Sequence, residues 1–382
     1  MATEGGFDVR GMIGLSGPVN TNVPYDTTSL AGKTILITGG ASGFGEAFAK
    51  HWTGYGSNII IGDVNDSAGE SLVAELRSLP GSSGHHHYQH CDVTSWTDQV
   101  ALFQTAVRVS PTGGIDAVVA NAGIMEKESA PTGQGVENPR NLDLDENPEP
   151  QPPSLAVLNT NLTGVVYTVH LAMFWLPRNE DPKYTQTGAS SAAAGNKRDR
   201  HILLLGSIAG ILPIPGQMQY TAAKHAVTGI FRSLRGSSFR HGIRTNLVMP
   251  YFVHTPFIPW QGLTLLAGGG MAELEDVVDA ATRLMADESI VGRGLAVGPK
   301  VDVVDDSNGQ PRIVEGKKKV EGEQTQAVWD VYAHDYEEVE LFVFRFVRLM
   351  YRLVKIGGWI GWLTDIFHAY VYRKKVAHQR RA

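Results

Sequence analysis

Cysteine is almost absent from this chain of 382 residues, in which Cys91 is the only one. A single cysteine cannot form a disulfide within the chain, so the fold has to be stabilised without one. The hydrophobic content of 42% is that of a globular protein. The length is enough for a sizeable core in one large domain or two modest ones.

The sequence also lacks an excess of positive charge and an apolar N-terminal leader. Its formal net charge is −6, which excludes a nucleic-acid footprint over the whole surface. The first twelve residues contain no basic region followed by an apolar run, so we predict no secretory signal. The sequons at Asn65 and Asn161 are therefore expected to carry no glycan, and a cytoplasmic location is expected for the catalytic domain.

Histidines cluster beside the single cysteine, at His85, His86, His87 and His90. One interpretation is a metal site. Adjacent histidines on an extended chain point to opposite sides and cannot all bind one ion, and the sequence offers no matching second ligand cluster. The favoured interpretation is a polar loop that enters a strand, and no metal is expected.

A glycine-rich turn follows the first apolar strand pattern. Residues 33–38 predict a buried strand, residues 39–45 read Gly-Gly-Ala-Ser-Gly-Phe-Gly, and residues 46–52 predict a helix. A second apolar strand, 58–62, ends at Asp63. Glycines let the backbone approach a pyrophosphate, and a helix N-terminus favours its negative charge. This order of elements predicts a dinucleotide site.

The acid at the end of the second strand favours NAD over NADP. A carboxylate at Asp63 can bind the ribose hydroxyls of NAD and repels the additional phosphate of NADP. Ser42, Phe44 and Val64 supply no arginine or lysine to bind that phosphate. NAD is therefore the expected cofactor, and NADP is the less favoured one.

Further strands are predicted along the chain, each followed by polar or small residues. They span residues 87–92, 115–120, 202–205, 245–249 and 294–297. Together with the first two, they predict an α/β fold of the Rossmann type. It is a doubly wound parallel sheet of about seven strands with helices on both faces. Ligands bind at the carboxyl ends of the strands in such a sheet.

A tyrosine and a lysine are spaced for acid–base chemistry after the fifth predicted strand. Tyr220 and Lys224 lie four residues apart, so they share a helix face. A nearby ammonium favours the phenolate and is expected to lower the tyrosine pKa. Ser207, 13 residues earlier, can hold a substrate oxygen while Tyr220 exchanges its proton. This is general acid–base catalysis on an alcohol or a ketone.

Taken together, these motifs resemble the short-chain dehydrogenase/reductase family from about residue 33 to residue 297. The resemblance implies that Asn161, Ser207, Tyr220 and Lys224 are catalytic, with Asn161 holding a water in a proton relay. Lys224 would also bind the nicotinamide ribose. The cofactor-binding positions that the motifs and the resemblance imply are Gly39, Ser42, Gly43, Phe44, Gly45, Asp63, Val64, Asp92, Val93, Asn121, Ala122, Gly123, Tyr220, Lys224, Pro250, Val253 and Thr255.

Two ranges, 91–96 and 113–124, resemble one branch of that family, the 15-hydroxyprostaglandin-dehydrogenase-like enzymes. The branch includes alcohol dehydrogenases of fungal secondary metabolism. The chain departs from the family pattern at Tyr251, where a glycine is frequent, and this side chain either narrows the pocket or is merely accommodated. Two long insertions, near 126–153 and 178–200, are interpreted as solvated loops, with a substrate lid as the alternative.

The remaining segments are expected to flank the catalytic domain, which is assigned to residues 31–300. Residues 1–30 form an N-terminal arm, residues 301–326 a charged linker, and residues 327–382 an amphipathic, basic, helical extension. Within the extension, 341–372 predicts a helix lying in a membrane interface. The alternative is that its apolar face packs on the enzyme body or on a second subunit.

The expected activity is an NAD-dependent interconversion of a secondary alcohol and a ketone on a hydrophobic small molecule. The apolar substrate is inferred from Ile208, Ile211, Leu212, Pro213 and Ile214, where the family builds its pocket. The alternative is a non-redox scaffold or binding protein that holds NAD structurally. The resemblance further implies a homodimer or homotetramer, and no nucleic-acid partner is expected.

Overall fold

The computed structural model describes residues 11, 13–126, 136–137, 139, 142–143, 149, 151–179, 198–255, 270–305, 311–314, 324–331, 349, 352, 356, 358–364 and 366–367. The chain divides into two units, Leu15–Ala333 and a second one made of Met1–Gly14 with His334–Ala382. Most of the two predicted insertions, 126–153 and 178–200, lies outside the described residues.

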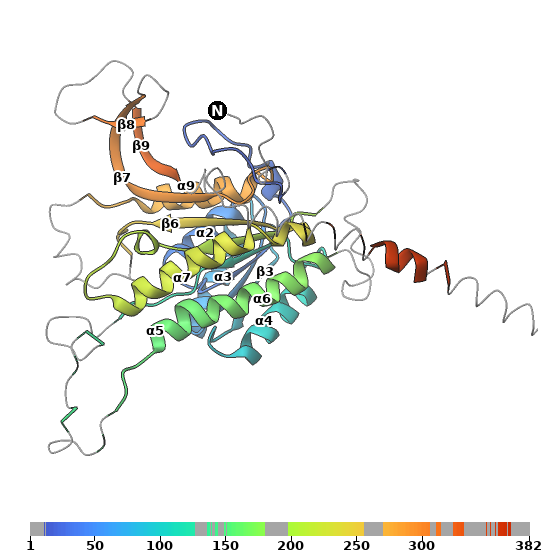
Figure 1. The fold of residues 1–382 in the computed structure, drawn as a ribbon, viewed down its shortest axis with the longest axis horizontal. Helices are drawn as coiled ribbons and strands as arrows, with labels where there is room; N and C mark the ends of the chain where they lie inside the picture. The colour runs from blue at the N-terminus through green and yellow to red at the C-terminus, as the bar shows by residue number, and fades with distance from the viewer. Residues whose placement is uncertain are drawn as a thin grey trace, which may run out of the picture. The chain divides into compact units, whose positions relative to one another are not determined.

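Within the described part of the first unit, the central element is a nine-stranded sheet in the order β3-β2-β1-β4-β5-β6-β7-β8, with β9 also paired to β7 (Figure 1). Neighbours from β3 to β7 are parallel, whereas β8 and β9 are antiparallel to β7. The predicted doubly wound sheet of seven parallel strands is confirmed. The strands are β1 (Thr34–Thr38), β2 (Asn58–Asp63), β3 (His86–His90), β4 (Ala117–Ala120), β5 (His201–Leu205), β6 (Arg244–Pro250), β7 (Gly294–Asp305), β8 (Pro311–Ile313) and β9 (Gln324–Val331).

Helices cover both faces of this sheet (Figure 1). On one face lie α2 (Gly43–Thr53), α3 (Asp66–Ser78) and α9 (Leu274–Ala286), and on the other α4 (Trp96–Val109), α6 (Gly164–Trp175) and α7 (Met218–Leu234). Short helical turns connect them: η1 (Thr28–Leu30), α5 (Ala156–Leu158), η2 (Asn159–Thr163), η3 (Leu176–Arg178), η5 (Ile208–Gly210) and η6 (Ser238–His241).

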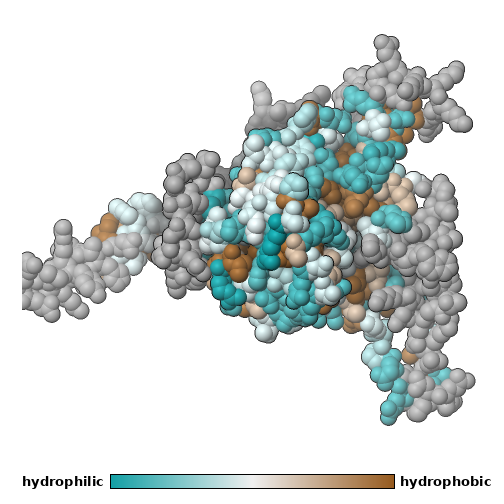
Figure 2. Space-filling view, turned by 180° about the vertical axis from the view of Figure 1, so that it is seen from behind, coloured by the Kyte–Doolittle hydropathy of each residue, from teal (hydrophilic) through white to brown (hydrophobic). Residues whose placement is uncertain are grey.

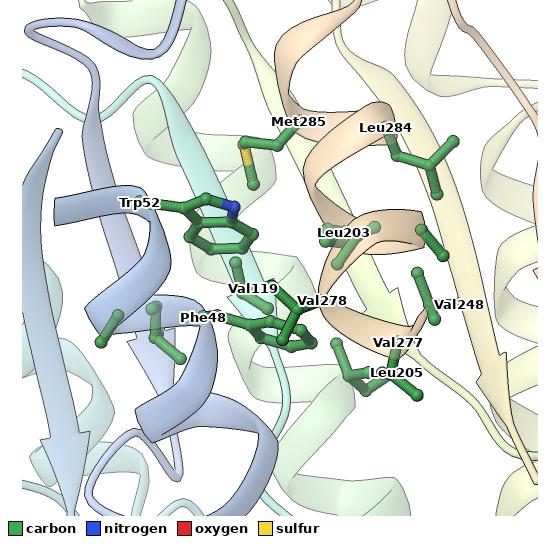
Figure 3. Packing of buried hydrophobic residues seen from close by; sticks show 14 of the residues in the cluster. Phe48, Trp52, Val119, Leu203, Leu205, Val248, Val277, Val278, Leu284 and Met285 are labelled. Carbon is green, nitrogen blue, oxygen red and sulfur yellow. The ribbon is translucent and has the colours of Figure 1, made fainter. Parts of the chain in front are cut away.

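Figure 3 shows the core on the α2/α9 face, where aromatic rings of α2 meet aliphatic side chains of α9 above the sheet. Phe48 and Trp52 are fully buried, and their rings stack with centroids 5.1 Å apart. The indole N–H of Trp52 donates to Thr282 Oγ1 at 2.9 Å, so its one polar atom is satisfied. This packing fixes α2, and with it the glycine turn that precedes the helix.

The charged linker predicted for 301–326 is not what the structure contains. Residues 301–305 continue β7, and residues 324–326 begin β9, which pairs with it. Val303 is buried while Asp302 pairs with Thr325 at the surface. Alternating apolar and charged residues suit a strand with one solvated face, so the polar composition misled the prediction. The domain boundary at residue 300 was therefore wrong, and the first unit extends to Ala333.

Residues 15–30 of the N-terminal arm pack on the rest of the first unit. The Tyr25 hydroxyl donates to Asp279 Oδ1 at 2.9 Å, and Arg283 donates to the carbonyls of Asn20, Thr21 and Val23. The Arg283 guanidinium also lies 4.4 Å from the centroid of the Tyr25 ring. These contacts tie the arm to α9.

The extension was predicted to be helical over 327–382. Its described residues beyond 348 are helical, whereas residues 327–331 are part of strand β9, so the prediction was wrong for them. Among the described residues, none of the helices combines the length and apolarity that a membrane crossing requires. Most of the predicted interfacial helix, 341–372, lies outside the described residues, which sample it at 349, 352, 356, 358–364 and 366–367.

Candidate active site

A cavity of about 650 Å³ opens at the carboxyl ends of the parallel strands. It is bordered by the glycine turn after β1, the acids after β2 and β3, the turn after β4, the end of β5, and α7. This is where ligands bind in doubly wound sheets. Its lining residues are Gly39, Ser42, Gly43, Phe44, Asp63, Val64, Cys91, Asp92, Val93, Thr94, Asn121, Ala122, Gly123, Ile124, Ala156, Asn159, Thr160, Leu205, Gly206, Tyr220, Lys224 and Thr255.

The glycine turn is packed so closely that side chains are excluded at two of its positions. At Gly39, with a φ of 62°, a Cβ would lie 2.7 Å from the Cα of Ala122. At Gly45, in the first turn of α2, a Cβ would lie 2.4 Å from the Gly39 carbonyl oxygen. The turn therefore brings the N-terminus of α2 against the cavity, where its free N–H groups favour an anion.

Asn121 fixes this turn from the neighbouring strand. Its Nδ2 donates to the carbonyl oxygens of Thr38 and Gly39, at 3.0 Å and 2.8 Å. Its backbone N–H donates to Thr38 Oγ1 at 3.2 Å. The amide thus links the ends of β1 and β4.

Two carboxylates face the cavity at the ends of β2 and β3. Asp63 accepts hydrogen bonds from the backbone N–H groups of Ala41 and Asn65, both at 3.0 Å. Asp92 Oδ1 accepts from the backbone N–H and the hydroxyl of Thr94, both at 2.8 Å. Among the lining residues the only lysine or arginine is Lys224. Asp63 therefore places a carboxylate at this end of the cavity with no lysine or arginine beside it among the lining residues.

Tyr220 and Lys224 lie on the buried face of α7, where they meet the end of β5. The Lys224 Nζ donates to the Leu205 carbonyl oxygen at 2.8 Å and lies 5.6 Å from the centroid of the Tyr220 ring. Burial lowers the pKa of Lys224 to about 8. Burial also raises the pKa of Tyr220, and the hydrogen bond with Ser207 opposes that rise. The net lowering of the Tyr220 pKa expected from Lys224 was therefore wrong for the protein alone, because desolvation of the phenolate outweighs it.

Ser207 is held directly after β5 in an extended conformation, as the N-cap of η5. Its Oγ accepts from the backbone N–H of Ala209 at 3.1 Å. With the Tyr220 hydrogen bond, this sets the serine hydroxyl beside the phenol. The two hydroxyls form a pair that can bind one substrate oxygen.

Asn161 is fully buried within η2, a π-helical turn that precedes α6. Such turns are rare and occur frequently at functional sites. The side-chain amide is engaged with Ile124, donating from Nδ2 to its carbonyl oxygen and accepting from its N–H, both at 2.8 Å. Asn161 therefore fixes the segment after β4, and its neighbours Asn159 and Thr160 line the cavity in its place.

A second, smaller cavity of about 50 Å³ shares Phe44, Gly206, Tyr220 and Thr255 with the first. It is mostly apolar and aromatic, and Tyr251 is part of its wall. Of the five residues predicted to form an apolar pocket, Ile208 and Ile214 line this cavity, whereas Ile211, Leu212 and Pro213 are exposed. The full lining is Phe44, Met125, Gly206, Ser207, Ile208, Ile214, Tyr220, Pro250, Tyr251, Phe252, Val253 and Thr255.

The structure brings most of the predicted site residues together. Pro250 and Val253 line the second cavity, and Phe44, Tyr220 and Thr255 line both. Gly45 and Asn161 line neither and act through packing and hydrogen bonding. The histidines of the 85–90 cluster are engaged separately: His86 with Ser82 and Ile59, and His90 with Asp66. No group of three or more potential metal ligands occurs among the described residues.

Sequence reasoning missed a clamp at the start of the helix that carries Tyr220. Glu126 Oε1 accepts from the backbone N–H of Gln219 at 2.9 Å, and Gln217 exchanges hydrogen bonds with the backbone of Glu126 at 3.1 Å and 3.2 Å. Gln219 Nε2 donates to the Ser154 carbonyl oxygen at 2.8 Å. A carboxylate at a helix N-terminus is stabilising. The sequence gives little indication of this clamp, because Glu126 and its partners Gln217 and Gln219 are separated by about ninety positions in the chain.

Comparison with known proteins gives a consistent picture. A family model described as short chain dehydrogenase matches residues 33–259. The chain is 34% identical over 303 residues to 5'-hydroxyaverantin dehydrogenase of Dothistroma septosporum, covering 75% of this chain and 91% of the relative. It is 37% identical over 299 residues to a 5'-hydroxyaverantin dehydrogenase of Emericella nidulans, covering 74% of this chain and 90% of the relative.

A solved structure supports the fold independently. A 3-ketoacyl-(acyl-carrier-protein) reductase from Brucella melitensis, crystallised with NADH, superposes with a TM-score of 0.54. The match covers 70% of this chain and 98% of the reductase at 23% identity. At that identity the likeness shows the fold alone.

Proposed function

Because this chain belongs to the short-chain dehydrogenase family, we propose that it is an NAD-dependent oxidoreductase acting on a secondary alcohol or the corresponding ketone. The observation that carries the proposal is the convergence of Ser207, Tyr220 and Lys224 where the two cavities meet. A hydroxyl pair backed by a buried amine at the end of a nucleotide-binding sheet is suited to moving a proton to or from a substrate oxygen.

The residues of the larger cavity fit a dinucleotide. The close packing at Gly39 and Gly45 sets the N-terminus of α2 at the cavity, where it can receive a pyrophosphate. Asp63 and Asp92 stand at the ends of adjacent strands, where they can accept hydrogen bonds from ribose and adenine. When bound, a nicotinamide cofactor accepts or supplies the hydride.

The protein residues would handle the proton. In the oxidation, Ser207 Oγ and Tyr220 Oη hold the alcohol oxygen, and the phenolate form of Tyr220 takes the alcohol proton and becomes the phenol as the carbinol carbon gives up its hydride. The buried amine of Lys224 stands one helical turn from the phenol, where its charge favours the phenolate form. The reverse reaction returns the proton from Tyr220 to the ketone oxygen.

The choice of NAD follows from charge at the ribose end of the cavity. The Asp63 carboxylate faces the cavity beside the exposed side chain of Val64. A phosphate on the ribose would meet this carboxylate with no arginine or lysine among the lining residues near it. Repulsion that no positive side chain offsets lowers the affinity for NADP.

For the substrate we propose a hydroxylated, hydrophobic small molecule of secondary metabolism. The smaller cavity presents Phe44, Tyr251 and Phe252 next to the proposed acid–base residue. Such walls select an apolar body and leave the polar recognition to the reacting oxygen. Two relatives are named 5'-hydroxyaverantin dehydrogenase, so 5'-hydroxyaverantin is the first substrate to test.

The experiment is a turnover assay of the full chain with NAD, NADP and a panel of hydrophobic secondary alcohols. We expect NADH formation with at least one alcohol, and a loss of kcat of about 100-fold or more in Tyr220→Phe. Tyr167→Phe, on the helix α6 surface, is the matched control and should retain the wild-type rate. Binding of NAD without any turnover over the panel, or wild-type turnover in Tyr220→Phe, would favour the non-redox scaffold and contradict the proposal.

A further inference from the structure

The C-terminal unit presents a row of large apolar side chains to solvent. In the described part of residues 356–367, all of which is helical, every large apolar residue is exposed. Two indoles, Trp359 and Trp362, are exposed by 67% and 57%, and their ring centroids lie 5.9 Å apart. The exposed set is Ile356, Trp359, Ile360, Trp362, Leu363, Ile366 and Phe367.

Helical spacing places this set on one side. At about 100° per residue, the seven positions fall within an arc of about 160°. The other described positions of this segment, Gly358, Gly361 and Thr364, lie on the opposite side of the circumference. The segregation is complete over these ten described positions, so the segment is an amphipathic helix with small and polar residues opposite its apolar face. Figure 2 shows brown, hydrophobic residues on this described segment.

Charge divides sharply between this end of the chain and the rest. Residues 341–382 contain nine lysines and arginines against one aspartate, a net charge of +8. The whole chain carries −6, so residues 1–340 carry −14. The basic residues flank the apolar segment on both sides in the sequence, at Arg345, Arg348, Arg352 and Lys355 before it and at Arg373, Lys374, Lys375, Arg380 and Arg381 after it.

We propose that residues 341–382 bind the surface of an anionic lipid bilayer, with the helix around 356–367 lying in the plane of the interface. An apolar arc with tryptophans and flanking lysines and arginines is the composition of such helices. No helix in the described part of the chain has the length and apolarity needed to cross the ~30 Å hydrocarbon core. Anionic headgroups such as phosphatidylserine complement the net charge of +8 on residues 341–382. The boundary between headgroups and acyl chains would cover the apolar arc.

The test is flotation of the full chain with vesicles of phosphatidylcholine alone or of phosphatidylcholine with phosphatidylserine. We expect the full chain to float with the anionic vesicles. Its partition coefficient should be at least tenfold lower in high salt, and at least tenfold lower with neutral vesicles. Trp359→Gln with Trp362→Gln should abolish it. On the wild-type protein, brominated acyl chains should quench tryptophan fluorescence, and Trp359→Phe with Trp362→Phe should lose that quenching while still floating.

A matched pair of single substitutions separates the contribution of the proposed membrane-binding face from that of exposed apolar residues elsewhere on the chain. Ile360 and Ile313 are exposed by 58% and 56%, but Ile313 lies on β8 in the other unit. We expect Ile360→Gln to weaken the partition coefficient about tenfold and Ile313→Gln to leave it unchanged. Equal effects of the two substitutions, or no flotation of the wild-type chain, would overturn the proposal. So would a lipid-free dimer that depends on Trp359 and Trp362, since it would assign this face to a second copy.

Discussion

Replacing Lys224 with methionine is expected to stabilise the cofactor-free protein while it removes the activity. Burial lowers the pKa of Lys224 from 10.5 to about 8, and this difference corresponds to about 3 kcal/mol of unfolding free energy. The hydrogen bond from Lys224 to the Leu205 carbonyl oxygen offsets about 1 kcal/mol of it. Methionine has a similar volume without the charge, so we expect the variant to gain about 2 kcal/mol near neutral pH.

The sign of this effect depends on pH in a defined way. Below about pH 8, Lys224 is protonated in the folded and the unfolded chain, and the wild-type protein carries the full burial cost. Between about pH 8 and 10.5 the unfolded chain binds the proton that the folded chain has released, so wild-type stability rises with pH. The advantage of the methionine variant should therefore shrink across this interval.

Urea unfolding of both proteins without cofactor, at several pH values from neutral to about 10.5, measures the difference. A methionine variant less stable than wild type near neutral pH would show that burying the Lys224 charge does not destabilise the protein. A stability difference that does not change with pH would contradict the same premise. The activity of the variant, assayed in parallel, should be lost in either case, because the amine is also proposed to act on the Tyr220 proton.

Three further predictions concern the cofactor turn and the helix clamp. Replacing Asp63 by serine together with Val64 by arginine should raise the ratio of kcat/KM for NADP to kcat/KM for NAD by about 100-fold. An unchanged ratio would show that Asp63 does not select the cofactor. Gly45→Ala should weaken NAD binding at least tenfold in titration calorimetry, because its Cβ would meet the Gly39 carbonyl oxygen at 2.4 Å; wild-type affinity would contradict the close approach. Glu126→Ala should cost about 1 kcal/mol in urea unfolding and lower kcat severalfold, with recovery in Glu126→Gln, and a change in stability without a change in kcat would leave the clamp a purely structural role.

Much of the central sheet could be predicted because its signals are local. Short strands of four to six residues, which end at Asp63 or just before Gly39 and Asn121, carry both the strand and the turn chemistry in a few consecutive positions. The order of Asn161, Ser207, Tyr220 and Lys224 added a family resemblance that the comparisons confirm. The roles proposed for these four residues stay predictions until turnover is measured, and so does the expected homodimer or homotetramer.

What could not be predicted depends on contacts between distant parts of the chain. The 301–326 range was interpreted as a linker because its charges are visible in the sequence, whereas the strand pairing that orders Val303 is not. The direction of the Tyr220 pKa shift was wrong for the same reason, since four-residue spacing reveals the neighbouring amine but not the burial that opposes it. The hydrogen bonds of Glu126 to Gln217 and Gln219 join segments whose proximity only the fold creates.

Tyr220 and Ser207 are proposed to act on the oxygen of an alcohol or ketone, and a crystal structure of the chain with NADH and a ketone product would show where that oxygen binds. We expect the ketone oxygen at about 2.6–3.2 Å from both Tyr220 Oη and Ser207 Oγ, with the carbon body of the ligand against Tyr251 and Phe252. A ketone oxygen directed away from both hydroxyls, with the cofactor in the larger cavity, would contradict it.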